Sequence, residues 1–176
     1  LPPDAQHVVN TYRTAQAHIL INADGPAIQP GSRTYERSWI RDGALTSTAL
    51  LYTGHPERVR AFIDWYVPYQ YDNGKVPCVV DRRGPDPVDE HDSTGEMIYL
   101  LARYYDFTHD RTALEKFYPN VVAGIDYLEK LRDTRRTAEY EDGTEEQRAF
   151  YGLVPESISH EGYCAKPMHS YWDGFW

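Results

Sequence analysis

The residues best equipped for chemistry lie in the stretch 37–46, where a polar segment turns into an apolar helix. Trp39 offers a flat apolar ring, Arg41 a planar fork of donors, and Asp42 two acceptor oxygens. Because a helix N-terminus carries a partial positive charge, Asp42 is well placed in the first turn. Together these groups suit a polyhydroxylated ring with one apolar face and a rim of hydroxyls. The alternative interpretation is that Asp42 is a helix cap beside an exposed Arg41, with Trp39 in the core.

Two further segments place carboxyl groups just before or within the first turn of a predicted helix. His91-Asp92-Ser93-Thr94-Gly95-Glu96 begins one helix, and Ser93 or Thr94 with Glu96 approaches a capping box. Asp92 is therefore either a pocket residue or a simple N-terminal carboxylate, and Glu96 is more typical of a cap. The acidic run 86–92 contains enough carboxylates to suggest a metal site, but such a loop is usually solvated, and we expect no metal.

The third segment, Gly152-Leu153-Val154-Pro155-Glu156-Ser157, surrounds Glu156 with apolar neighbours, which favours a raised carboxyl pKa. The alternative is a loop carboxylate in a salt bridge. Farther along, Tyr163, Tyr171 and Trp172 are candidates for stacking on a ligand. Tyr171 and Trp172 point to different faces of a helix, so at least one of that pair belongs to the core.

These motifs must be positioned by helices, since apolar residues recur at helical spacing through most of the chain. We expect helices over residues 4–21 and 41–52, from Pro56 through Tyr66, from about residue 93 to a break at 108–110, over 111–117, from Pro119 through Leu131, and from about residue 167 onward. Residues 76–80 form at best a short edge strand, because Pro77 interrupts them.

The connections alternate between long and short. The long ones, over residues 22–40, 69–90 and 133–166, each precede a motif-bearing helix, whereas the short ones join helices into hairpins. In antiparallel hairpins this alternation places every long loop at the same end. We therefore predict an all-α fold of antiparallel hairpins with its long loops, and its functional site, on one face.

Composition limits the class of protein. A chain of 176 residues with 41% apolar residues fits one globular domain. Its net charge of −9 argues against nucleic acid or an anionic membrane surface as a partner, and no stretch approaches the length of a membrane span. Two cysteines, Cys78 and Cys164, could form one bridge, so the cysteines leave the cellular compartment open.

The order and spacing of the three motifs resemble those of the (α/α)6-barrel, or six-hairpin, glycosidases, most closely the glucoamylase-like family 15 type. The stretch Trp39-Ile40-Arg41-Asp42-Gly43-Ala44-Leu45-Thr46 is similar to a family motif at the start of the second helix. The resemblance implies that Trp39, Arg41 and Asp42 line subsite −1. It also implies that Asp92 and Glu96 shape the pocket and that the carboxylate before the sixth helix is the general acid.

By position that acid is Glu156, but Pro155 stands where the family has Trp, so Glu161 in His160-Glu161-Gly162-Tyr163 is the alternative. The family fold has six hairpins, whereas residues 1–176 hold about three. The resemblance therefore implies an N-terminal half barrel whose catalytic base lies in the other half. We expect either self-association that completes a ring or a longer parent chain, and little activity from this chain alone.

We therefore expect an inverting glycoside hydrolase that acts on an α-glucoside or related sugar, with His91, Tyr163 and Trp172 also lining the site and no metal or organic cofactor. One alternative is a phosphorylase on the same fold, which needs a cluster of donors for the phosphate. Another is a non-catalytic sugar-binding or helical scaffold module, in which Glu156→Gln leaves ligand binding intact.

Overall fold

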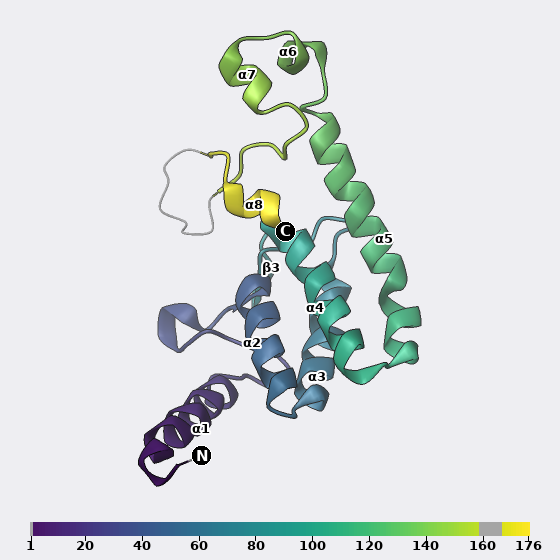
Figure 1. The fold of residues 1–176 in the computed structure, drawn as a ribbon. Helices are drawn as coiled ribbons and strands as arrows, with labels where there is room; N and C mark the ends of the chain where they lie inside the picture. The colour runs from purple at the N-terminus through teal and green to yellow at the C-terminus, as the bar shows by residue number, and fades with distance from the viewer. Residues whose placement is uncertain (1, 159–166) are drawn as a thin grey trace.

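The computed structural model describes residues 2–158 and 167–176, and over these residues the protein is mostly helical (Figure 1). The all-α prediction is confirmed at this level. The first helix, α1 (Gln6–Ile21), follows one turn of 3-10 helix and lies at the edge of the fold with no fully buried residue. Within the described part of the chain, no helix combines the length and apolar character needed to cross a bilayer.

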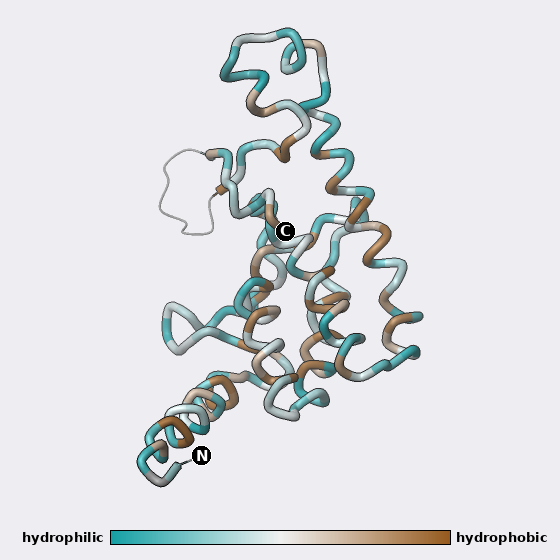
Figure 2. Tube along the Cα trace, in the orientation of Figure 1, coloured by the Kyte–Doolittle hydropathy of each residue, from teal (hydrophilic) through white to brown (hydrophobic). Residues whose placement is uncertain are grey.

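The core is built where α2 (Ile40–Tyr52), α3 (Pro56–Tyr66) and α4 (Asp92–Thr108) pack together. Apolar residues recur along each of these helices (Figure 2), and Leu50, Phe62, Tyr66 and Leu100 are almost completely buried. Gly43 allows the closest approach, because a Cβ at this position would lie 2.2 Å from Cζ of Phe62. The core therefore fixes the N-termini of α2 and α4 relative to one another.

One continuous helix, α5 (Arg111–Asp133), replaces the two helices expected around Pro119. Proline removes one backbone donor and usually kinks or ends a helix. Here Phe117, two residues before the proline, is buried against the α2–α4 core. Five residues after the proline, Gly124 lies so close to α4 that an added Cβ would be 3.0 Å from the Thr94 methyl group. Packing on both sides of Pro119 thus outweighs the local break signal, and the predicted boundary is wrong.

A small antiparallel sheet joins two of the long connections. It consists of β1 (Ser38–Trp39), β2 (Val79–Asp81) and β3 (Gly84–Pro85) in that spatial order, with Ser38 opposite Val80. The central strand therefore includes only the last two residues of the extended piece predicted at 76–80, and it is not an edge. Pro77 lies outside the paired residues, and its carbonyl accepts a hydrogen bond from the Tyr66 hydroxyl at 2.9 Å, so it costs the sheet no donor.

The third long connection contains two short helices, α6 (Ala138–Glu141) and α7 (Glu145–Ala149), and leads to α8 (Tyr171–Phe175). It returns to the second connection, because the Ile158 amide donates to the Asp89 carbonyl at 3.0 Å. Together with the β1–β2 pairing, this contact links the second long connection to both the first and the third. Cys78 is buried and free, whereas Cys164 lies outside the described residues.

Candidate functional site

Asp92 is the point at which three distant segments meet. Arg41, in the first turn of α2, places Nη1 3.0 Å from Oδ2 of Asp92 and 3.3 Å from Oε2 of Glu90. The indole Nε1 of Trp172, in α8, donates to the same Asp92 oxygen at 2.7 Å. The first and second predicted motifs, and the predicted aromatic residue Trp172, are thus brought together.

Trp172 is positioned by contacts that seat α8 on α4. The Ser170 hydroxyl caps α8 by accepting the Trp172 amide, and Asp173 accepts from the Ser157 hydroxyl at 2.8 Å. A Cβ at Gly95 would lie 2.4 Å from the carbonyl oxygen of Trp176, so only glycine permits this close seating. Tyr171 points to solvent instead, which confirms that the two aromatic residues occupy different faces.

Glu96 is not the cap that the sequence suggested. The α4 N-cap is His91, with no side-chain cap bond, and Glu96 is completely buried. Among the described residues, neither of its carboxyl oxygens has a hydrogen-bond partner. Burial, reinforced by the charge of Asp92, raises the pKa of Glu96 to about 10, so this carboxyl group is neutral at pH 7. His91 is also buried, and burial lowers its pKa.

Glu90 is the functional candidate that sequence reasoning missed. It appeared only as a member of the acidic run 86–92, which we interpreted as solvated. That interpretation holds for Asp89, whose side chain is 61% exposed, but fails for Glu90, which is 10% exposed. Burial raises the pKa of Glu90 to about 7 despite the opposing charge of Arg41. Two neighbouring carboxyl groups, Glu90 and Glu96, thus differ in proton affinity.

Asp42 lies beside this cluster as a half-buried carboxylate. The N-cap of α2 is Trp39, which makes no side-chain cap bond, so Asp42 occupies the third helical position and is not a cap. No hydrogen bond from another described residue reaches its carboxylate, and burial raises its pKa. Asp42 therefore retains acceptor capacity for a ligand hydroxyl.

Trp39 belongs to a neighbouring cluster. Its ring lies under the Arg37 guanidinium at 5.4 Å and contacts Tyr35 at a centroid distance of 6.2 Å. It is half-buried, so the core interpretation does not hold for it either. Its described aromatic and cationic partners come from the connection before α2 rather than from the Asp92 cluster.

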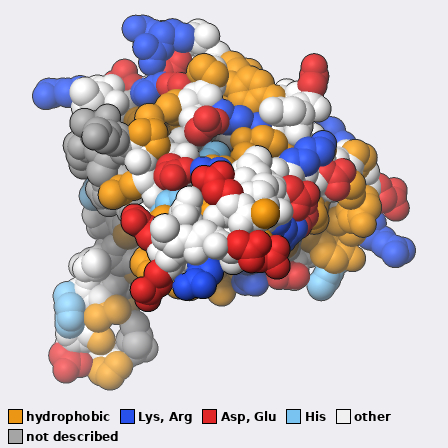
Figure 3. Space-filling model, turned by 90° about the horizontal axis from the view of Figure 1, so that it is seen from above, with side chains coloured by type: hydrophobic (Ala, Val, Ile, Leu, Met, Phe, Trp, Pro, Cys, Tyr) orange, Lys and Arg blue, Asp and Glu red, His pale blue; other side chains and the backbone are white. Residues whose placement is uncertain are grey.

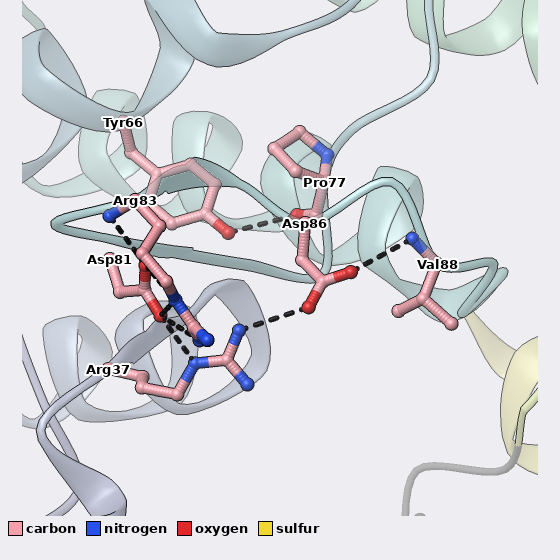
Figure 4. A network of polar contacts seen from close by, with 7 residues as sticks. All are labelled: Arg37, Tyr66, Pro77, Asp81, Arg83, Asp86 and Val88. Carbon is pink, nitrogen blue, oxygen red and sulfur yellow. Dashed lines mark hydrogen bonds and ion pairs between the residues drawn. The ribbon is translucent and has the colours of Figure 1, made fainter.

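Arg37 also organises the second connection (Figure 4). It donates to Asp81 at 2.8 Å and to Asp86 at 3.0 Å, while Arg83 donates to Asp81 at 2.6 Å. Arg37 and Arg41, four residues apart, therefore bind the two ends of the segment 81–92. This arrangement explains how Glu90 and Asp92 are delivered to Arg41.

Glu156 lies in a different setting. Its partners are Arg135 and His169, the latter at 3.2 Å, and its side chain is 42% exposed. Hydrogen bonding to its own backbone amide and to Arg135 lowers its pKa. A general acid needs the opposite direction, so the geometry does not favour Glu156 in that role. The alternative acid Glu161 and the stacking candidate Tyr163 lie outside the described residues.

Acidic and basic side chains are interspersed on the face that carries α6 and α7 (Figure 3), so the net charge of −9 is not gathered there. Within residues 2–158 and 167–176, no group of His, Cys, Asp and Glu side chains has the arrangement to hold a metal ion. Comparisons with protein-family models, with curated proteins and with solved structures found no match to this chain.

Proposed function

We propose that this chain is part of an inverting glycoside hydrolase for an α-glucoside or related sugar, built as about half of an (α/α)6 toroid. The observation that carries the proposal is the meeting of Arg41, Glu90, Asp92 and Trp172, with the Asp42 carboxylate beside them. A planar donor fork, acceptor carboxylates and an indole at one helix end match the hydroxyl rim and apolar face of a sugar.

Inverting hydrolysis needs one protonated carboxyl group to assist the leaving oxygen and one carboxylate to activate water. Glu90 suits the acid role better than Glu156, because its pKa of about 7 keeps it partly protonated at neutral pH. In this proposal Arg41 orients the sugar and Asp42 accepts one of its hydroxyls. The family resemblance implies Glu156 by position, with Glu161 as the alternative, and Glu161 lies outside the described residues.

The charge of the site favours hydrolysis over phosphorolysis. A phosphorylase must gather donors around a phosphate, but Arg41 is already engaged by Glu90 and Asp92. An incoming dianion would meet these carboxyl groups, which oppose its binding. Water carries no such penalty.

Binding of methyl α-glucoside and maltose to the 176-residue chain, followed by tryptophan fluorescence and calorimetry, tests the proposal. We expect Arg41→Lys and Asp92→Asn to weaken binding at least tenfold, whereas the surface control Arg103→Lys leaves it unchanged. Glucose release that disappears in Glu90→Gln while binding persists supports hydrolysis. Because the proposal places the catalytic base in the other half of the toroid, binding without glucose release agrees with it, whereas a chain that binds neither sugar contradicts it.

A further inference from the structure

A large open cavity lies along the connection before α2 and shares no residue with the Arg41–Asp92 cluster. Its volume is about 1010 Å³, and it is bounded by residues 21–37, by Trp65 and Tyr69, and by residues 80–84. Small-molecule sites typically enclose about 300–1,000 Å³, so this cavity stands at the upper end of that range. It has room for a ligand of several rings rather than one.

One side of the cavity is aromatic. Trp65, near the end of α3, and Tyr69, in the following turn of 3-10 helix, have ring centroids 5.6 Å apart and planes inclined at 72°. Both are half-buried and packed against the main core. The core therefore holds these rings in place while part of each remains open to the cavity.

Most of the other lining side chains are polar or charged, while Ile21, Ala23, Ala27 and Val80 add apolar surface. The uncharged members that can both donate and accept hydrogen bonds are Asn22, Gln29, Ser32 and Thr34.

The charged lining residues nearly balance. Four arginines (Arg33, Arg37, Arg82 and Arg83) face three carboxylates (Asp24, Glu36 and Asp81), which leaves a formal excess of one positive charge. Arg37 and Arg83 are both bound to Asp81, and the carboxylates Asp24 and Glu36 remain at the wall. A strongly anionic or cationic ligand would therefore meet like charge, whereas a neutral ligand rich in hydroxyls would not.

The hairpin wall is preorganised. The Asp81 side chain is 6% exposed and accepts from Arg37 and from both the backbone and the guanidinium of Arg83 (Figure 4). Because these bonds fix the turn between β2 and β3, a ligand need not order this wall when it binds.

We propose that this cavity is a second binding site, separate from the Arg41–Asp92 cluster, and that it takes a neutral oligosaccharide through Trp65 and Tyr69. The rings contact the apolar faces of the sugar units, and the surrounding amides, hydroxyls and charged groups bind their hydroxyls. The inference shares with the proposed function only the class of ligand, since none of the lining residues belongs to the first cluster.

The test is an amide NMR titration of the 176-residue chain with neutral tetrasaccharides of the malto-, cello-, manno- and xylo- series. We expect at least one series to shift resonances of residues 22–36 and 80–84. Tyr69→Ala should weaken that binding about tenfold, the loss of roughly one aromatic contact. Tyr118→Ala removes an exposed tyrosine of α5 outside the cavity and serves as the matched control. Gln29→Ala changes another lining residue of the cavity without removing a ring that packs on the core.

The outcomes separate this site from the proposed function. Shifts confined to Arg41, Asp92 and their neighbours overturn the second site and leave the first proposal standing. Shifts confined to the cavity support the second site and count against the first. Shifts at Arg33 and Arg82 with inorganic sulfate, and none with any tetrasaccharide, identify an anion site and overturn the inference. The inference also fails when no ligand of the panel shifts the cavity residues.

Discussion

At the residue scale, the carboxyl groups around Arg41 show how burial changes the pKa of each group. Glu96 has no hydrogen-bond partner among the described residues and no exposure, so its charged form is strongly disfavoured. Burial raises the pKa of Glu90 as well, but the Arg41 guanidinium, which Glu90 shares with Asp92, opposes this rise and leaves the pKa at about 7. Neighbouring groups of the same chemistry thus differ because Glu90 accepts a hydrogen bond from Arg41, whereas Glu96 is more deeply buried and accepts none from a described residue.

Replacing Glu96 by Gln should remove a pH dependence of stability. The unfolded chain releases this proton above about pH 4.3, whereas the folded chain retains it up to about pH 10. Stability therefore falls as the pH rises through that interval, by up to about 1.4 kcal/mol for each pH unit. Urea unfolding of the wild type and Glu96→Gln between pH 6 and about pH 9 measures the difference.

Glu96→Gln should become progressively more stable than the wild type as the pH rises. The exposed Glu115 of α5 provides the control, since Glu115→Gln should follow the wild-type curve. Parallel curves for the wild type and Glu96→Gln would show that the Glu96 carboxyl is not held protonated.

Glu90 should titrate near neutral pH under the influence of Arg41. We expect a midpoint of about 7 for its side-chain carbonyl carbon in a ¹³C NMR titration. Arg41→Met removes the charge that lowers this pKa, so the midpoint should move higher. Arg103→Met, a change at the surface of α4, should leave it in place. A Glu90 midpoint near the ordinary glutamate value would mean that the group is solvated.

At the scale of elements, the close contact of α2 with α3 positions Arg41. Gly43 lies two residues after Arg41, and the Phe62 ring occupies the space that a side chain would need. Gly43→Ala should lower the free energy of unfolding by about 1–3 kcal/mol through overpacking, and it should also displace Arg41. Chemical denaturation provides the measurement.

Gly174→Ala in α8 is the matched control for Gly43→Ala. Its added Cβ meets no atom within 4 Å, so it should be neutral or slightly stabilising. Equal effects of the two substitutions would remove the role assigned to the Phe62 contact.

At the scale of the whole molecule, the helices at the two edges of the fold leave apolar side chains uncovered. The exposed set on α5 follows one helical stripe and consists of Leu114, Tyr118, Val122 and Ile125. On α1, Val8 and Tyr12 are also exposed. Such faces favour association, because burying apolar surface is the main driving force of assembly. Self-association of this chain stays a prediction.

Sedimentation equilibrium should detect concentration-dependent association of the wild-type chain. Tyr118→Glu places a charge in the α5 stripe and should shift the population toward monomer. Thr112→Glu, an exposed change before the stripe, should have little effect. A wild-type chain that is monomeric at all concentrations would contradict the prediction.

The sequence by itself determined the helical class. It also singled out Arg41 and Asp92, which the structure brings together, while their role in binding a ligand stays a prediction. Helical periodicity, caps and loop lengths are local signals, so they can be read along the chain. They failed at Pro119, where packing on both sides of the proline holds α5 together.

Only the tertiary structure decided which carboxyl groups are buried and what each contacts. It distinguished Glu90 from Asp89 and gave Glu156 the partners Arg135 and His169. It also placed the Trp172 indole on Asp92, eighty positions earlier in the chain. The physical reason is that the pKa of a carboxyl group depends on solvent exclusion and nearby charge, and both are supplied by residues distant in sequence.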